Sequence, residues 1–111
     1  MPIIKNLTPH TINIITEKGT LIREFPSEGI ARASQFQEYV GNIGRIELVK
    51  TSFGAPIGLP DPEEGVYYIV SLATANAARE NGREVKDLLL TSDPVRDDEG
   101  RIIGCRRLAV L

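Results

Sequence analysis

Several residue types are scarce in this chain, and each scarcity excludes a class of structure or chemistry. The single cysteine, Cys105, excludes a disulfide bond within one chain. Because His10 is the only histidine, a zinc site built from cysteine and histidine side chains is excluded as well. There is no tryptophan and aromatic residues make up only 5% of the chain, so aliphatic side chains must form the core, which favours β structure.

Long apolar runs and an excess of one charge are also missing. No run approaches the roughly 18 apolar residues of a membrane-spanning helix, and the N-terminus lacks the apolar stretch of a signal peptide. We therefore expect a soluble, cytoplasmic protein without a membrane partner. The 13 basic and 15 acidic residues give a formal net charge of -2, which does not favour general binding to nucleic acid.

Short strand and turn signals follow one another at near-regular spacing along the 111 residues, a length typical of one domain (1–111). Residues 11–25 alternate apolar and polar side chains around Lys18-Gly19 and predict a β-hairpin. Residues 97–100 predict the turn of a second hairpin near the C-terminus. The apolar run 66–72 predicts a strand that is central in its sheet, and 85–91 is another candidate for a buried strand.

The middle of the chain gives weaker strand signals. We expect a short strand at 30–33, then a glutamine-rich polar excursion up to Gly44, then a strand within 45–51. Three prolines and three glycines lie between residues 53 and 65, and they predict an irregular loop.

One helix is predicted. Ser71 is a suitable N-cap for a helix from Leu72 to Glu80, and Asn81-Gly82 is a typical helix end. Together these signals predict a mainly β (α+β) fold. We expect a small β-barrel or a two-layer β sandwich of six to eight short strands with one short helix, rather than a parallel α/β sheet.

Side chains suited to catalysis or metal binding are present, but not in recognisable patterns. A nucleophilic Cys105 would need a nearby base, for which only His10 is available, so a buried structural cysteine is the favoured interpretation. The acidic residues at 61–64 and 97–99 lack the spacing of a calcium loop, and no glycine motif for binding phosphate is present. We therefore expect no metal, no cofactor, and binding rather than catalysis.

The segment Asn6-Leu7-Thr8-Pro9-His10 concentrates polar side chains just before the first apolar run. Asparagine and threonine side chains commonly close local turns onto the backbone, especially before proline. Asn6 and Thr8 therefore have a structural as well as a ligand-binding interpretation. His10 has no such structural requirement, so it is either a polar cap at a strand end or part of a site.

Arginines gather in the C-terminal hairpin, at positions 96, 101, 106 and 107. Arginine suits bidentate recognition of phosphate or carboxylate, and the alternative is ion pairing with the neighbouring acidic residues. The candidate ligand-binding residues of the chain are Asn6, Thr8, His10, Ser71, Arg96, Asp97 and Arg106.

Three blocks of sequence resemble a family of small uncharacterised proteins encoded in tailed-phage genomes, prophages and bacterial chromosomes. The blocks are NLTPH, GLPDPEEGVYYIVS and DLLLTSDPVRDDEGRIIGC, and they stand in the family's order over nearly the whole chain. The matching positions are Asn6, Thr8, Pro9, His10, Leu59, Pro60, Ser71, Arg96, Asp97, Gly100, Gly104 and Cys105. The family carries no established activity. The resemblance implies a phage-related role in the host cytoplasm, by analogy with small phage proteins that counter host defence.

Three functions are compatible with the sequence. The first is sequestration, without catalysis, of a small anionic and nucleotide-derived ligand, as in counter-defence against host immune signalling. The second is an interaction module or inhibitor that docks on a host protein, which the glutamine-rich excursion and the proline-rich loop favour. The third is a nucleotide-directed hydrolase with His10 as general base. The apolar C-terminus favours a homo-oligomer in all three.

Overall fold

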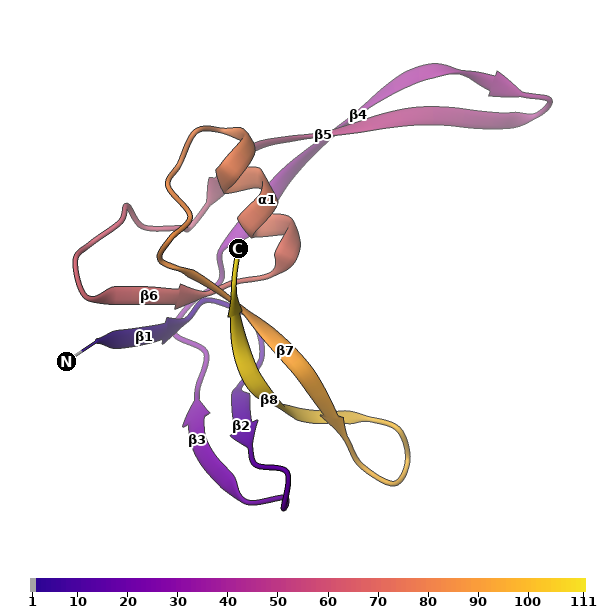
Figure 1. The fold of residues 1–111 in the computed structure, drawn as a ribbon. Helices are drawn as coiled ribbons and strands as arrows, with labels where there is room; N and C mark the ends of the chain where they lie inside the picture. The colour runs from indigo at the N-terminus through magenta and orange to yellow at the C-terminus, as the bar shows by residue number, and fades with distance from the viewer. Residues whose placement is uncertain (1) are drawn as a thin grey trace.

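The structure, a computed structural model, describes residues 2–111, which form a six-stranded sheet, a separate two-stranded sheet and one helix (Figure 1). In chain order the elements are β1 (Ile3–Asn6), β2 (Ile12–Ile15), β3 (Leu21–Phe25), β4 (Arg32–Ile43), β5 (Ile46–Ile57), β6 (Val66–Ile69), α1 (Leu72–Glu80), β7 (Leu88–Arg96) and β8 (Ile102–Val110). The predicted mainly β fold, with eight strands and one short helix, is confirmed.

The larger sheet has the strand order β1-β6-β7-β8-β2-β3. The two predicted hairpins are present, because β2 pairs antiparallel with β3 and β7 pairs antiparallel with β8. The pairs β1–β6, β6–β7 and β2–β8 are parallel, so the sheet is mixed. Within residues 2–111, β1 and β3 are its two edges, and the sheet does not close into the barrel that was one of the expected architectures.

The helix α1 has the limits that the sequence predicts. The Ser71 hydroxyl accepts a hydrogen bond from Thr74 N at 3.2 Å, as an N-cap does, and Asn81 ends the helix. The helix joins the parallel strands β6 and β7, so the fold contains one parallel crossover that the turn spacing did not indicate.

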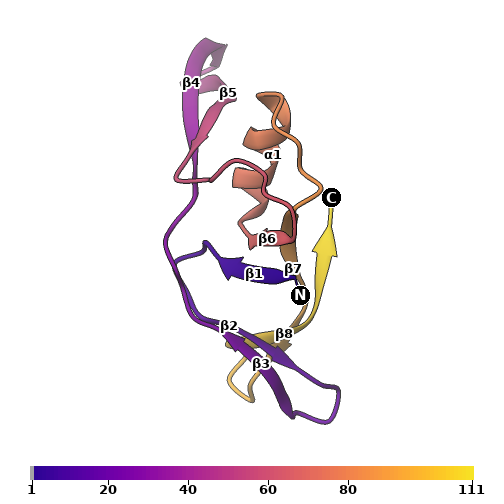
Figure 2. The same cartoon turned by 90° about the vertical axis from the view of Figure 1, so that its left-hand side faces the viewer.

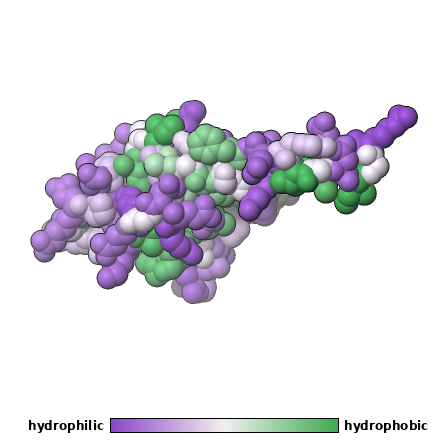
Figure 3. Space-filling model, turned by 90° about the horizontal axis from the view of Figure 1, so that it is seen from above, coloured by the Kyte–Doolittle hydropathy of each residue, from purple (hydrophilic) through white to green (hydrophobic). Residues whose placement is uncertain are grey.

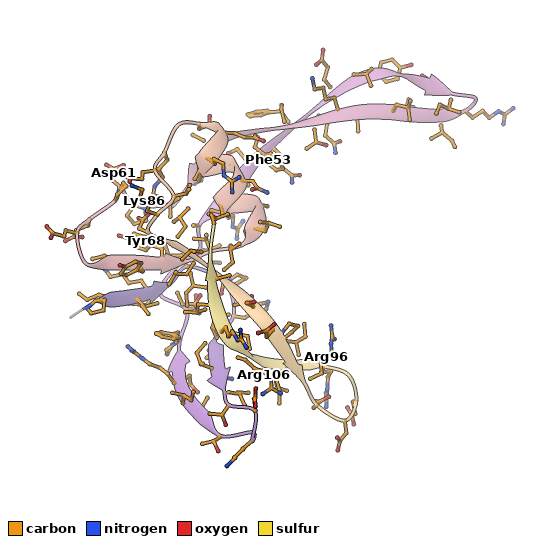
Figure 4. The ribbon with its side chains drawn as sticks, in the orientation of Figure 1. Phe53, Asp61, Tyr68, Lys86, Arg96 and Arg106 are labelled. Carbon is orange, nitrogen blue, oxygen red and sulfur yellow. The ribbon has the colours of Figure 1, made fainter. Side chains whose placement is uncertain are left out.

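The core lies where α1 packs on β6 and β7. Ala75 and Ala78 are fully buried in this cluster. Tyr68 on β6 is buried in the same cluster, and Figure 4 shows it beneath the helix. The buried cluster consists of Leu7, Ala31, Val66, Tyr68, Val70, Ala75, Ala78 and Leu88.

Strands β4 and β5 form a separate hairpin, which we call the arm. Each strand has 12 residues, which corresponds to about 40 Å at ~3.3 Å per residue. Gly44 and Arg45 form the turn, and Gly44 has a φ of 58°, which suits a tight hairpin. Figures 1 and 2 show the arm projecting from the body next to α1, and the molecule measures 52 × 39 × 21 Å.

The arm corrects two predictions. The glutamine-rich stretch up to Gly44 is not an irregular excursion but the long strand β4, and residues 53–57 belong to β5 rather than to a loop. Both faces of the arm are largely exposed, so its strands carry polar residues without the alternation that a half-buried strand shows. Pro56 is tolerated because it lies where the ladder is irregular, next to the register shift between Arg32 and Ser34.

We predict that Gly104→Ala destabilises the fold by about 1–3 kcal/mol, because the neighbouring strand β2 lies against Gly104. A Cβ atom at Gly104 would lie 2.7 Å from the Asn13 carbonyl oxygen and 2.6 Å from Ile15 Cδ1. Gly54→Ala is the matched control, since its Cβ would press on the movable ring of Phe36 and lie 3.4 Å from Ser34 Cβ, and it should cost less than about 1 kcal/mol. Urea unfolding at low micromolar protein concentration measures the loss of stability in both variants. Equal losses in the two variants would contradict the close contact at Gly104.

Candidate functional site

The Asn6 side chain is at the centre of the NLTPH segment and has no exposed surface. Its Nδ2 donates to His10 O at 2.7 Å and to Phe25 O at 2.8 Å. Its Oδ1 accepts from Thr8 N at 2.9 Å and from the Thr8 hydroxyl at 2.6 Å. The local turn that the sequence suggested for Asn6 and Thr8 is therefore present, and Asn6 has no free group for a ligand.

Backbone hydrogen bonds extend this turn to the root of the arm. Asn6 O accepts from Glu28 N at 2.9 Å, and Leu7 O accepts from Ala31 N at 3.0 Å. The Ser27 hydroxyl donates to Thr8 O at 2.6 Å. Since β4 begins at the residue after Ala31, the NLTPH turn fixes where the arm leaves the body.

Thr8 and Ser71 lie close together. Both line a hollow of about 450 Å³ at the N-terminal end of α1, together with Arg32 and Gln35 from the root of the arm. Ser71 is occupied as the helix cap, and its hydroxyl is also 2.9 Å from the Thr74 hydroxyl.

His10 lies in a different hollow, of about 500 Å³, on the face of the sheet formed by β2, β7 and β8. The side chains around it are mostly apolar, and they include Ile12, Pro94 and Ile103. Cys105 lines the same hollow but is buried, and burial raises the pKa of its thiol above the usual value. A protonated thiol is a poor nucleophile, so this hollow does not present an activated cysteine.

Arg96 and Asp97 are placed at the far end of the β7–β8 hairpin, where they hold its turn. Arg96 Nη1 donates to Gly100 O at 2.8 Å. Asp97 Oδ1 accepts from Glu99 N and Arg101 N, at 2.9 and 3.0 Å, and Asp97 pairs with Arg101. The alternative interpretation for Asp97, pairing with a neighbouring arginine, is the one that the structure shows.

Arg106 is on β8, and Figure 4 shows it and Arg96 on the same hairpin. Its Nη1 atom is buried and has no hydrogen-bond partner within residues 2–111. The neighbouring Arg107, by contrast, pairs with Asp93 at 3.1 Å.

The seven candidate residues therefore do not surround one hollow. Thr8 and Ser71 share one and His10 lines another, whereas Asn6 is enclosed and Asp97 is used in a turn. Within the described chain, no group of three or more His, Cys, Asp or Glu side chains is arranged to hold a metal ion. The one helix has nine residues, and no described helix has the length and hydropathy of a membrane span.

The arm is the feature that sequence reasoning missed. Large apolar side chains stand exposed along it, with Phe36 at 61% and Ile43 and Ile46 at 66% of their full exposure. Figure 3 shows hydrophobic surface gathered along one side of the arm toward its tip. The exposed apolar residues of the arm are Phe36, Tyr39, Val40, Ile43, Ile46, Leu48 and Val49, with Ile57 at its base. Their presence in otherwise polar stretches was the signal that could have indicated a docking surface.

No protein-family model, curated protein or solved structure matches this chain.

We predict that Asn6→Asp destabilises the protein by about 2–4 kcal/mol, because the carboxylate cannot donate to the buried carbonyls of His10 and Phe25. Thr8→Val is the control: it keeps the shape and the backbone bonds, loses only the partly exposed hydroxyl contacts to Asn6 Oδ1 and His10 O, and should cost about 1 kcal/mol. Thermal and denaturant unfolding measure both. An Asn6→Asp variant as stable as the wild type would contradict the role of this turn.

Proposed function

We propose that this chain is an interaction protein that engages a protein partner through the arm. The observation that carries the proposal is a two-stranded hairpin, 12 residues in each strand, with large apolar side chains exposed on it. At its base the arm contacts α1, where Asn81 Nδ2 donates to Phe53 O at 3.4 Å. Figure 4 shows Phe53 at this base, whereas the tip lies far from the body.

The low stability expected of an uncovered arm favours a bound partner. A two-stranded hairpin is marginally stable in water unless a third strand or a packed layer covers it. Apolar area removed from water contributes roughly 25 cal/mol per Å², so a partner that covered the arm would stabilise it. The arm has, in addition, two strand edges with free hydrogen-bonding groups, which natural proteins usually protect or pair.

This proposal develops the interaction-module hypothesis, in which the glutamine-rich stretch docks on another protein. That stretch is β4 of the arm. The proposed phage or prophage origin and the proposed cytoplasmic location of the protein agree with such a role, as a component of an assembly or as an inhibitor of a host protein.

A second candidate function, sequestration of a small anionic and nucleotide-derived ligand, is supported at one place. Thr8, Ser71 and Arg32 line the hollow at the N-terminal end of α1, where the helix dipole favours negative charge. Native mass spectrometry of the purified protein tests this candidate function. Sequestration requires that a small molecule co-purifies with the wild type and that it is lost from the Arg32→Ala variant. Turnover of a nucleotide that His10→Ala abolishes would instead support the hydrolase hypothesis, with the nucleotide in the separate hollow that His10 lines.

We predict that a photo-reactive benzoyl-phenylalanine in place of Phe36 forms a covalent protein adduct on illumination in cells. Ile22 on β3 is the matched control position, because its exposed fraction of 64% is close to the 61% of Phe36 but it lies on the body. Adducts are detected by gel electrophoresis and mass spectrometry. The proposal requires a discrete adduct from position 36 that position 22 does not give; labelling from neither position would contradict it.

A further inference from the structure

The two faces of the arm differ in character. In an antiparallel pair, residues opposite one another lie on the same face, and the faces alternate along the strand. The register between β4 and β5 therefore separates two sets of cross-strand pairs. One face, which we call the apolar face, carries Phe36, Ile43, Ile46 and Leu48. The other, which we call the polar face, carries Gln35, Gln37, Thr51, Asn42 and Glu47, with Tyr39, Val49 and, at the base, Phe53 as its apolar members.

The cross-strand pairs on the apolar face have a consistent composition. Three of the five pairs join a large side chain to a small one, or an acid to a base. From base to tip the pairs are Ser34 with Gly54, Phe36 with Ser52, Glu38 with Lys50, Gly41 with Leu48, and Ile43 with Ile46. The two strands of this face therefore differ in side-chain size or charge at several levels. Where they differ, a large or charged side chain on one strand stands opposite a small or oppositely charged side chain on the other.

Such a pattern is complementary to itself. When two arms stack face to face about a two-fold axis parallel to their length, β4 of one copy lies over β5 of the other, at equal levels. The Cα atom of Phe36 then lies over the partner's Ser52, and Leu48 lies over the partner's Gly41. Ile43 meets the partner's Ile46. Aligned packing of two sheets about 10 Å apart gives this arrangement.

The charged pair provides a second, independent complementarity. Glu38 and Lys50 stand opposite one another on the ladder, but within residues 2–111 no ion pair joins them. In the stacked arrangement each Glu38 lies over the partner's Lys50, so two interchain pairs form at the middle of the face. If the two arms were stacked so that they pointed in opposite directions, β4 would lie over the partner's β4. At the level of this pair, Glu38 would then lie over the partner's Glu38.

The ring of Phe36 agrees with the same arrangement. A Cβ atom at Gly54 would lie 2.7 Å from Phe36 Cε2, which means that the ring leans across the arm over Gly54. Ser34, which pairs with Gly54 across the ladder, has a small side chain and leaves space above it. The partner's Phe36 ring leans toward the partner's β5, which lies over β4 of the first copy. It therefore fills the space above Ser34, and the two rings lie side by side.

From these contacts we infer that a second copy of this chain is the partner of the arm, and that the two copies pack through their apolar faces about a two-fold axis parallel to the arm. This inference rests on the proposed function, since it names the partner of the same surface. It leaves the polar face in solvent, and it buries the four apolar side chains Phe36, Ile43, Ile46 and Leu48 of each copy.

The test uses the full-length chain and charge reversal at the middle of the face. Glu38→Lys places a lysine over the partner's Lys50, and Lys50→Glu places a glutamate over the partner's Glu38. Sedimentation equilibrium between 1 and 200 µM (roughly the range in which modest interfaces associate) measures the dimer dissociation constant. Glu47→Lys is the control, because Glu47 lies on the polar face and its change alters the net charge as Glu38→Lys does.

The wild type and Glu47→Lys should dimerise with similar constants, whereas each charge-reversal variant alone should dimerise on the order of 100-fold more weakly. An equimolar mixture of Glu38→Lys and Lys50→Glu should recover the dimer, because lysines of one copy then face glutamates of the other. This recovery also shows that both variants are folded.

Two results would overturn the inference. A wild-type dimer that neither reversal weakens would use another surface, and a wild-type chain that stays monomeric at 200 µM (roughly the upper end of that range) would have no self-association through the arm. If the monomer still gave an adduct with a different protein from position 36, the proposed function would stand while the inference failed. If it gave no adduct, both would fail.

Discussion

The buried side-chain amide of Asn6 links three segments that are distant in the fold. Two hydrogen bonds join the end of β1 to His10, just before β2, and to Phe25 at the end of β3, and two more close the turn onto Thr8. A buried donor or acceptor left without a partner costs about 1–3 kcal/mol, so each of these bonds is expensive to lose. The adjacent backbone bonds from Glu28 and Ala31 carry the same constraint to the residue where the arm begins.

The position of the arm therefore depends on the NLTPH turn. Ala31 is tied on both sides, since its N–H donates to Leu7 O and its carbonyl accepts from the Thr74 hydroxyl of α1 at 3.2 Å. The turn and the helix together fix the first residue of β4 on the body. A stretch of sequence that first suggests a ligand site is, in the structure, the support for the arm.

The sequence predicted the local structure well where side chains impose it. Ser71 and Asn81 bound the helix, Gly19 and the acidic turn at 97–100 mark the hairpins, and the short strands follow from apolar alternation. The arm could not be predicted in this way, because both of its faces meet solvent and no core imposes a period on β4. The parallel pairing of β2 with β8 joins residues about 90 positions apart, and local patterns carry no information on it.

The candidate site was predicted only in part. Burial of Cys105 and the local turn at Asn6 and Thr8 were correct, and both are consequences of residue type and neighbours. Which residues meet in space depends on the order of the strands, and this order separates His10 from Ser71 and both from Asp97.

The central claim is that the arm is marginal by itself and is stabilised by a second copy on its apolar face. Hydrogen–deuterium exchange of the wild-type chain at low and high protein concentration tests it most directly. The account predicts that backbone amides of residues 35–51 exchange more slowly as the concentration rises, while those of α1 do not change. Exchange in residues 35–51 that is equally fast at every concentration would contradict it.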